Sequence, residues 1–197
     1  FYVRENMMTG PIPSTLGALG AVKELFFFDN LFDHSLPVEL NKLTSLQILR
    51  LQHNLLTGSL EGVFNINMTL LENVDLSDNK FSGKIPTNIF ELPDLNSVAL
   101  SMNCFEGSLP DRMCAARNVS VLSMDGLGAA KDCKNSWVIP LSGVAVFNTL
   151  EGSVPACLWS LPALQVLHLT GNGLTGRIGE PNAIGPSLRT VSLGEIK

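Results

Sequence analysis

Three histidines are the side chains of this 197-residue chain best suited to general acid–base chemistry. They are His34, His53 and His168, and they fall in three separate parts of the sequence. Acid–base catalysis needs a histidine within hydrogen-bonding reach of a nucleophile or of a second titratable group. We expect His168 to face Gln165 or Thr170, and neither arrangement supplies a nucleophile and base. The sequence therefore predicts no enzyme, and we name no catalytic residue.

The cysteines and glycines give no sign of a metal or cofactor site. The four cysteines, Cys104, Cys114, Cys133 and Cys157, include no pair separated by two residues, the spacing common in structural zinc sites. The glycines of 171–173 lack the remainder of a Walker or dinucleotide-binding motif. We therefore predict no bound metal and no cofactor.

Composition excludes several classes of partner. The net charge is −5 and the isoelectric point about 5.1, which is the wrong sign for binding nucleic acid or an anionic membrane surface. No apolar run approaches the roughly 20 residues needed to span a bilayer, so we expect no direct membrane insertion by this segment. A hydrophobic content of 45% is ample for one folded domain.

An internal repeat organises the whole chain, and residues 71–86 are its clearest copy. An asparagine follows apolar residues at −8, −5 and −3 and precedes apolar residues at +2 and +6, with glycine at +4 and often proline at +7. Most copies are 24 or 25 residues apart. We interpret the 45 residues that separate the fifth and sixth asparagines as two repeats with three residues missing. The repeat asparagines are Asn6, Asn30, Asn54, Asn79, Asn103, Asn148 and Asn172.

This period predicts an α/β repeat solenoid, because no single repeat can bury its own apolar face. The apolar residues at −5 and −3 have strand spacing. The asparagine that ends each strand is placed to bond backbone groups at the turn, so we expect the stacked asparagines to form a ladder through the core. We assign residues 1–197 to one domain of about eight repeats, with both ends in mid-repeat and an irregular insert at 128–143.

The string L-x-x-N-x-L-x-G-x-I-P, seen at Leu76–Pro86 and Phe1–Pro13, resembles the plant-type leucine-rich repeat. That repeat is found in receptor-kinase and receptor-like-protein ectodomains, in polygalacturonase-inhibiting proteins and in other secreted proteins. The resemblance implies a right-handed leucine-rich-repeat superhelix with a parallel β-sheet on its concave face. It also implies short 3₁₀ or irregular segments on the convex face.

Positions −4 and −2 in each repeat face outward from the expected sheet, and we look for function there. The first three repeats place aromatic residues beside arginine, a composition typical of binding hot spots. An alternative is that the two phenylalanines touch a missing neighbour or a glycan. The middle repeats carry Asp75, Ser77, Ser101 and Asp125, which we interpret as a solvated face. The predicted ligand-binding residues are Tyr2, Arg4, Phe26, Phe28, Arg50, Gln52 and His53.

Two further features bear on covalent modification. We expect a disulfide between Cys114 and Cys133 that pins the irregular insert, while Cys104 and Cys157 fit buried thiols equally well. The remaining feature is a pair of N-glycosylation sequons at Asn67 and Asn118, which favour the secretory pathway.

We therefore predict an extracellular, non-enzymatic recognition module that binds a protein or peptide through its concave face. One alternative is a structural component that binds neighbouring subunits in a cell-surface assembly. A second alternative, an inhibitor of a secreted glycosidase, depends on the family resemblance alone.

Overall fold

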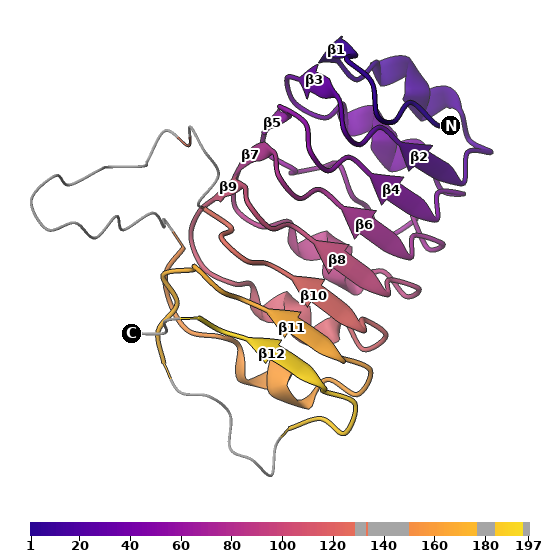
Figure 1. The fold of residues 1–197 in the computed structure, drawn as a ribbon. Helices are drawn as coiled ribbons and strands as arrows, with labels where there is room; N and C mark the ends of the chain where they lie inside the picture. The colour runs from indigo at the N-terminus through magenta and orange to yellow at the C-terminus, as the bar shows by residue number, and fades with distance from the viewer. Residues whose placement is uncertain (129–132, 134–149, 177–183, 195–197) are drawn as a thin grey trace, which may run out of the picture.

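The computed structural model describes residues 1–128, 133, 150–176 and 184–194 and shows a solenoid of stacked coils (Figure 1). Each coil gives one short strand to a parallel sheet on the concave side, and Tyr2 extends the sheet through a parallel bridge to Phe26. The predicted leucine-rich-repeat fold class is confirmed. Along the sheet lie β2 (Glu24–Phe26), β4 (Ile48–Arg50), β6 (Asn73–Asp75), β8 (Ser97–Ala99), β10 (Val121–Ser123), β11 (Val166–His168) and β12 (Thr190–Ser192).

A second row of short strands follows the turn after the concave sheet (Figure 1). It contains β1 (Thr9–Pro11), β3 (Leu31–Asp33), β5 (Thr57–Gly58), β7 (Lys80–Gly83) and β9 (Cys104–Phe105). The convex side carries 3₁₀ helices η1 (Ser14–Ala18), η2 (Val38–Lys42), η3 (Thr87–Glu91), η4 (Asp111–Ala115) and η5 (Ala156–Ser160). Each begins directly after the proline at +7, whose ring fixes φ near the helical value.

The third coil tests this link between proline and helix. Glu61 stands at its +7 position, and the described residues of that coil form turns over 61–63 and 66–67 rather than a 3₁₀ helix. One missing proline therefore interrupts the convex row between η2 and η3.

The leucines of all coils form one continuous core that runs from Ile12 to Leu174. Because every coil shares its apolar interior with its neighbours, no coil is stable alone. Within the described residues, no helix is both long and apolar enough to cross a membrane.

The predicted asparagine ladder is present at the five buried asparagines, Asn30, Asn54, Asn79, Asn103 and Asn172. In Asn79 the amide nitrogen donates to the Leu51 carbonyl of the preceding coil, and Oδ1 accepts from the Leu56 N–H. Asn6 is a correction to the prediction. It lies in the first coil of the structure and is exposed, and its side-chain amide donates to the Arg4 carbonyl of its own coil instead of to another coil.

The region after Asn103 corrects the predicted repeat count. Strand β10 pairs directly with β11, with Leu122 opposite Leu167, so no further strand separates them; residues 144–146 lie outside the described residues. Leu150 instead forms a bridge to Gly107 in the second row. Val121 of β10 and Val166 of β11 are 45 residues apart, so this one coil has 21 more residues than the usual 24 and replaces two of the predicted repeats.

The backbone of Leu127 takes over the ladder bonds in this enlarged coil. Its carbonyl accepts from the Phe105 N–H at 2.8 Å, and its N–H donates to Oδ1 of Asn172 at 2.9 Å. The ladder therefore passes from Asn103 to Asn172 through a backbone unit. Asn148 and most of the predicted insert at 128–143 lie outside the described residues.

Two disulfides bracket the enlarged coil, and they correct the predicted Cys114–Cys133 bridge. Cys104 bonds Cys133, and Cys114 bonds Cys157. Cys114 lies in η4 and Cys157 in η5, which stack in adjacent coils once residues 121–165 are counted as one coil. The expectation of free thiols at Cys104 and Cys157 is also wrong.

Candidate binding surface on the concave face

The concave sheet presents a regular grid of side chains. Alternate residues of each strand point into the core, so the residues at −4 and −2 face outward. The parallel register aligns the −4 column from one strand to the next: Phe26 is paired with Arg50, and Arg50 with Asp75. Tyr2 continues this column through its bridge to Phe26.

The structure brings five of the predicted ligand-binding residues together as an aromatic–arginine patch of Tyr2, Arg4, Phe26, Phe28 and Arg50. The Tyr2 ring meets Phe26 edge-on at 4.8 Å between centroids, and Phe26 lies 6.2 Å from Phe28. The Arg50 guanidinium lies 5.4 Å from the Phe26 ring centroid, and that of Arg4 lies 5.8 Å from the Phe28 centroid. Every ring of the patch therefore has a partner on a neighbouring strand.

These contacts order the patch in advance of any ligand. A cation–π contact at an exposed site contributes about 0.5–1 kcal/mol, and fixing a long side chain on binding costs about 0.5–1.5 kcal/mol. The two terms are similar, so a ligand meets side chains whose ordering cost is already offset. The patch is also accessible, since Tyr2 is 60% exposed.

A hydrogen bond to Glu24 fixes the outer edge of the patch. The Tyr2 hydroxyl donates to the Glu24 carboxylate, and this bond raises the pKa of Tyr2 above its ordinary value of 10.0. Desolvation and the negative charge of Glu24 act in the same direction, while the positive charge of Arg4 lowers the pKa. Tyr2 therefore stays a neutral hydrogen-bonding group throughout the physiological range.

Gln52 and His53 lie at the next strand, beside the patch. The Oε1 atom of Gln52 is buried, and no donor among the described residues reaches it. A buried acceptor without a partner is costly, and its burial keeps this oxygen out of reach of a bound molecule. His53 points instead to the turn edge, where its Nδ1 lies 2.8 Å from Oδ2 of Asp78.

The concave face from β8 to β11 has more contacts between polar groups than the predicted solvated surface. The Ser101 and Ser123 hydroxyls lie 3.1 Å apart, and the Asp125 N–H donates to Ser101. His168 Nδ1 lies 3.6 Å from Asp125 Oδ2, a neighbour that the expectation of Gln165 or Thr170 did not include. Sequence reasoning missed this neighbour because it placed residue 145 between the two strands.

No catalytic or metal-binding arrangement is found in the part of the chain that the structure describes. The three histidines lie in three different coils, and each has an aspartate within 3.6 Å: Asp33, Asp78 and Asp125 respectively. No group of three or more His, Cys, Asp or Glu side chains gathers there in a metal-binding geometry.

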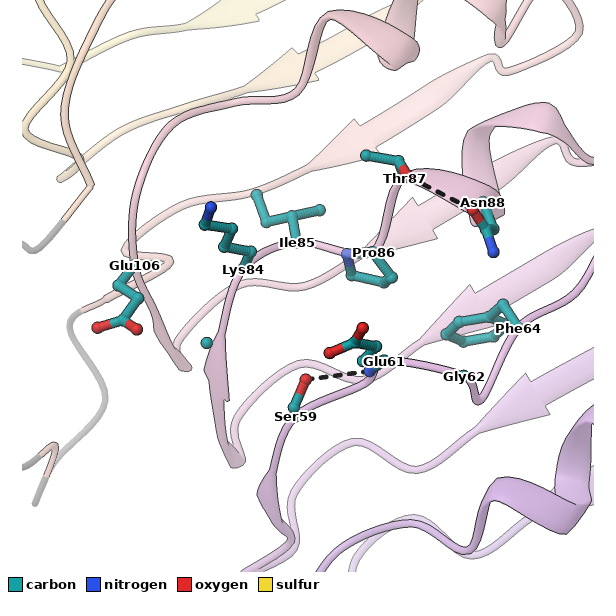
Figure 2. Close-up of a pocket in the computed structure, with 11 residues that line it drawn as sticks. Ser59, Glu61, Gly62, Phe64, Lys84, Ile85, Pro86, Thr87, Asn88 and Glu106 are labelled. Carbon is teal, nitrogen blue, oxygen red and sulfur yellow. Dashed lines mark hydrogen bonds between the residues drawn. The ribbon is translucent and has the colours of Figure 1, made fainter.

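The missing 3₁₀ helix of the third coil leaves a shallow hollow of about 490 Å³ away from the concave face (Figure 2). Phe64 and Ile85 line its apolar part, and Glu61, Lys84 and Glu106 lie around it. Figure 2 shows the Ser59 hydroxyl accepting a bond from the Glu61 N–H, which caps the turn that replaces the helix. The hollow therefore follows from the lost proline at +7.

Comparison with known proteins agrees with this architecture. The Leucine Rich Repeat family pattern matches residues 70–92. The chain is 29% identical to receptor-like protein 39 of Arabidopsis thaliana, over 96% of this chain and 24% of that protein. It is 30% identical to receptor-like protein 35 of the same plant, over 86% of this chain and 15% of that protein. The chain is a plant-type leucine-rich-repeat protein. It spans a quarter or less of the length of these two relatives.

Solved structures place the same leucine-rich-repeat architecture in plant receptors. The peptide hormone receptor RGFR1, in complex with RGF2, superposes with a TM-score of 0.83 at 26% identity, over 100% of this chain and 28% of that one. The Arabidopsis receptor kinase HAESA ectodomain, in complex with an IDA peptide hormone ligand, superposes with a TM-score of 0.79 at 27% identity. The match covers 96% of this chain and 28% of that one. Both neighbours were solved with a peptide ligand bound.

The two sequons lie on loops of this leucine-rich-repeat solenoid, away from its concave strands. Asn67 and Asn118 are both exposed, and each precedes the next concave strand by several residues. Asn118 also donates to the Pro93 carbonyl at 2.6 Å, which holds its side chain against the previous coil. Glycosylation at either asparagine remains a prediction.

Proposed function

We propose that this chain is an extracellular recognition module of a receptor-like protein and binds a peptide or protein partner through its concave face. The aromatic–arginine patch is the principal contact. The observation that carries this proposal is the set of rings and guanidinium groups ordered by inter-strand contacts at one end of the sheet.

Three further observations support the proposal. The patch is accessible at its outer edge, where Tyr2 is 60% exposed. Structural neighbours of this chain bind peptide hormones, according to their descriptions. Two disulfides suit an oxidising, extracellular environment.

The rigid sheet explains why such a surface binds well. Phe26 and Arg50 of the patch lie in strands that pair with a neighbour on both sides. A flexible peptide then loses its own conformational entropy on binding, while the receptor surface loses little. Aromatic and arginine side chains also dominate the measured energetics of protein interfaces.

The test begins with a displayed library of random dodecapeptides selected on the immobilised chain. The affinities of the selected peptides are then measured for the wild type and for the double variant Phe26→Ser with Phe28→Ser. We expect the double variant to bind them about tenfold or more weakly, the scale of a hot-spot loss.

A matched control removes two exposed apolar side chains elsewhere. Val38→Ser with Ile66→Ser changes side chains that are 49% and 62% exposed and lie off the concave strands. We expect this variant to bind as the wild type does. Equal loss in both variants, or no loss in either, contradicts the proposal; thermal unfolding of each confirms that the variants are folded.

A further inference from the structure

A second set of side chains on the concave face forms a polar cluster of Ser101, Ser123, Asp125, His168 and Thr170. The Asp125 carboxylate is its centre. Oδ1 accepts from the Thr170 N–H at 2.6 Å, and Oδ2 lies 3.6 Å from Nδ1 of His168. The Asp125 N–H donates to the Ser101 hydroxyl, which itself lies 3.1 Å from that of Ser123.

This geometry leaves one carboxylate oxygen available to a ligand. The Thr170 bond fixes the plane of the Asp125 carboxylate through Oδ1. The distance from Oδ2 to His168 is longer than a hydrogen bond, and both side chains remain about one third exposed, at 36% and 35%. An oriented, half-buried carboxylate binds ammonium or guanidinium groups well, because charge-assisted bonds are stronger than neutral ones.

The outward positions of the concave strands are divided by charge. Arg4 and Arg50 belong to the coils at one end, and the outward positions of β6, β8, β10, β11 and β12 carry no lysine or arginine. Asp75 and Asp125 are the carboxylates of that second region. Between them Ala99 has only a methyl group at −4, which leaves the sheet surface open.

The separation of the two regions sets a length for the ligand. Asp125 follows β10, which lies three strand steps from β4 with Arg50 and five from the coil of Arg4. Asp125 is therefore on average four strand steps from the two arginines. At about 4.8 Å per step this is roughly 19 Å. An extended peptide advances about 3.3–3.6 Å per residue, so it covers that distance in about six residues.

We infer that the concave face selects a peptide by the order of its charges. An acidic residue of the peptide binds at Arg4 and Arg50, and a lysine or arginine about six residues away binds at the Asp125 carboxylate of the polar cluster. This inference rests on the proposed function, since it specifies the chemistry of the ligand for the same face.

The displayed dodecapeptides selected on the wild-type chain supply the probes for a direct test. We expect the selected sequences to be enriched in pairs of one acidic and one basic residue separated by about five to seven positions. The unselected library gives the background frequency of such pairs. Selection in high salt serves as a second comparison, because ionic contacts at an exposed face weaken as salt rises.

Two variants separate the two charged regions. Asp125→Asn with His168→Gln removes the charge of the polar cluster, while the asparagine Oδ1 still accepts from Thr170 and preserves the fold. Selection on this variant is expected to lose the basic preference and keep the acidic one. Selection on Arg50→Gln is expected to lose the acidic preference and keep the basic one. Asp94→Asn, an exposed loop carboxylate with the same charge change, is expected to alter neither preference.

The outcomes also distinguish this inference from the proposed function. If selected peptides lose affinity for the Phe26→Ser, Phe28→Ser variant but show no spaced acid–base pairs, the recognition function stands and the charge-order inference fails. The charge-order inference fails in the same way if the Asp125 and His168 substitutions leave the basic preference unchanged. If the phenylalanine variant binds as tightly as the wild type, the proposed function fails.

Discussion

Replacing Asn79 with alanine removes four hydrogen bonds from the centre of the ladder. The amide nitrogen donates to the carbonyls of Leu51, Leu76 and Ser77 at 3.0, 3.2 and 3.1 Å, and Oδ1 accepts from the Leu56 N–H at 3.0 Å. Asn79 is 2% exposed, so water cannot replace these partners. The Leu56 N–H is left unpaired, while the Leu51, Leu76 and Ser77 carbonyls each lose one of two donors. Together these losses are expected to cost about 3–5 kcal/mol.

The assay is equilibrium unfolding in guanidinium chloride followed by far-ultraviolet circular dichroism. A loss of about 4 kcal/mol lowers the folding equilibrium constant roughly a thousandfold and shifts the midpoint to lower denaturant. The slope of the transition must also be compared, because a solenoid with one weakened interface can unfold in segments rather than as a unit.

Asn6→Ala is the matched control for this substitution. Asn6 ends the same kind of turn but is exposed and donates to the Arg4 carbonyl of its own coil. We expect its loss to cost less than about 1 kcal/mol. If Asn79→Ala destabilises the protein no more than Asn6→Ala does, inter-coil bonding by the asparagines is not what holds the turns together.

Three further predictions concern packing, covalent linkage and ionisation. Gly17→Ala places a new Cβ 2.3 Å from a backbone carbonyl oxygen of η2, and we expect a loss of about 1–3 kcal/mol and a lower melting temperature. Replacing both Cys114 and Cys157 with serine is expected to cost about 2–5 kcal/mol by thermal unfolding. Tyr2, the only tyrosine, should ionise above pH 10 when titrated by its absorbance at 295 nm. Because its folded pKa is raised, its contribution to stability is complete below pH 10 and is lost as the pH rises through the folded pKa.

Each of these predictions has a control. Gly20→Ala adds the same methyl group where no atom lies within 4 Å, so a melting temperature as low as that of the Gly17 variant contradicts the steric argument. For the disulfide, adding a reductant should lower the melting temperature of the wild type toward that of the serine variant. For Tyr2, Glu24→Gln should return the midpoint toward 10, and an unchanged midpoint means that the carboxylate is not the cause.

Local rules let the sequence predict most of the scaffold. A proline at +7 fixes the backbone for a 3₁₀ helix, and the one coil that has Glu61 there has no such helix. A constant spacing between asparagines also fixes the strand register. That is why Phe26 and Arg50 were expected to be neighbours and are found paired.

The prediction failed where one coil is enlarged. Residues 144–146 have strand-like spacing, so two halves of a single coil were counted as two repeats. This error propagated to the wrong cysteine pairing, because Cys114 and Cys157 become neighbours only when the extra coil is removed. It also hid the contact between Asp125 and His168. A rule that allows an insertion inside a repeat, instead of a deletion between two repeats, gives the correct repeat count, the correct cysteine pairing and the contact between Asp125 and His168.

The backbone of Leu127 keeps the ladder continuous at a position without asparagine. Its peptide unit supplies an acceptor to Phe105 and a donor to Asn172, so a coil 21 residues longer than its neighbours joins the ladder without leaving these buried groups unpaired. Loop closure costs rise only slowly with length. A repeat of unusual length can therefore be accommodated in the middle of the stack without a break in the backbone hydrogen bonds that join its neighbours.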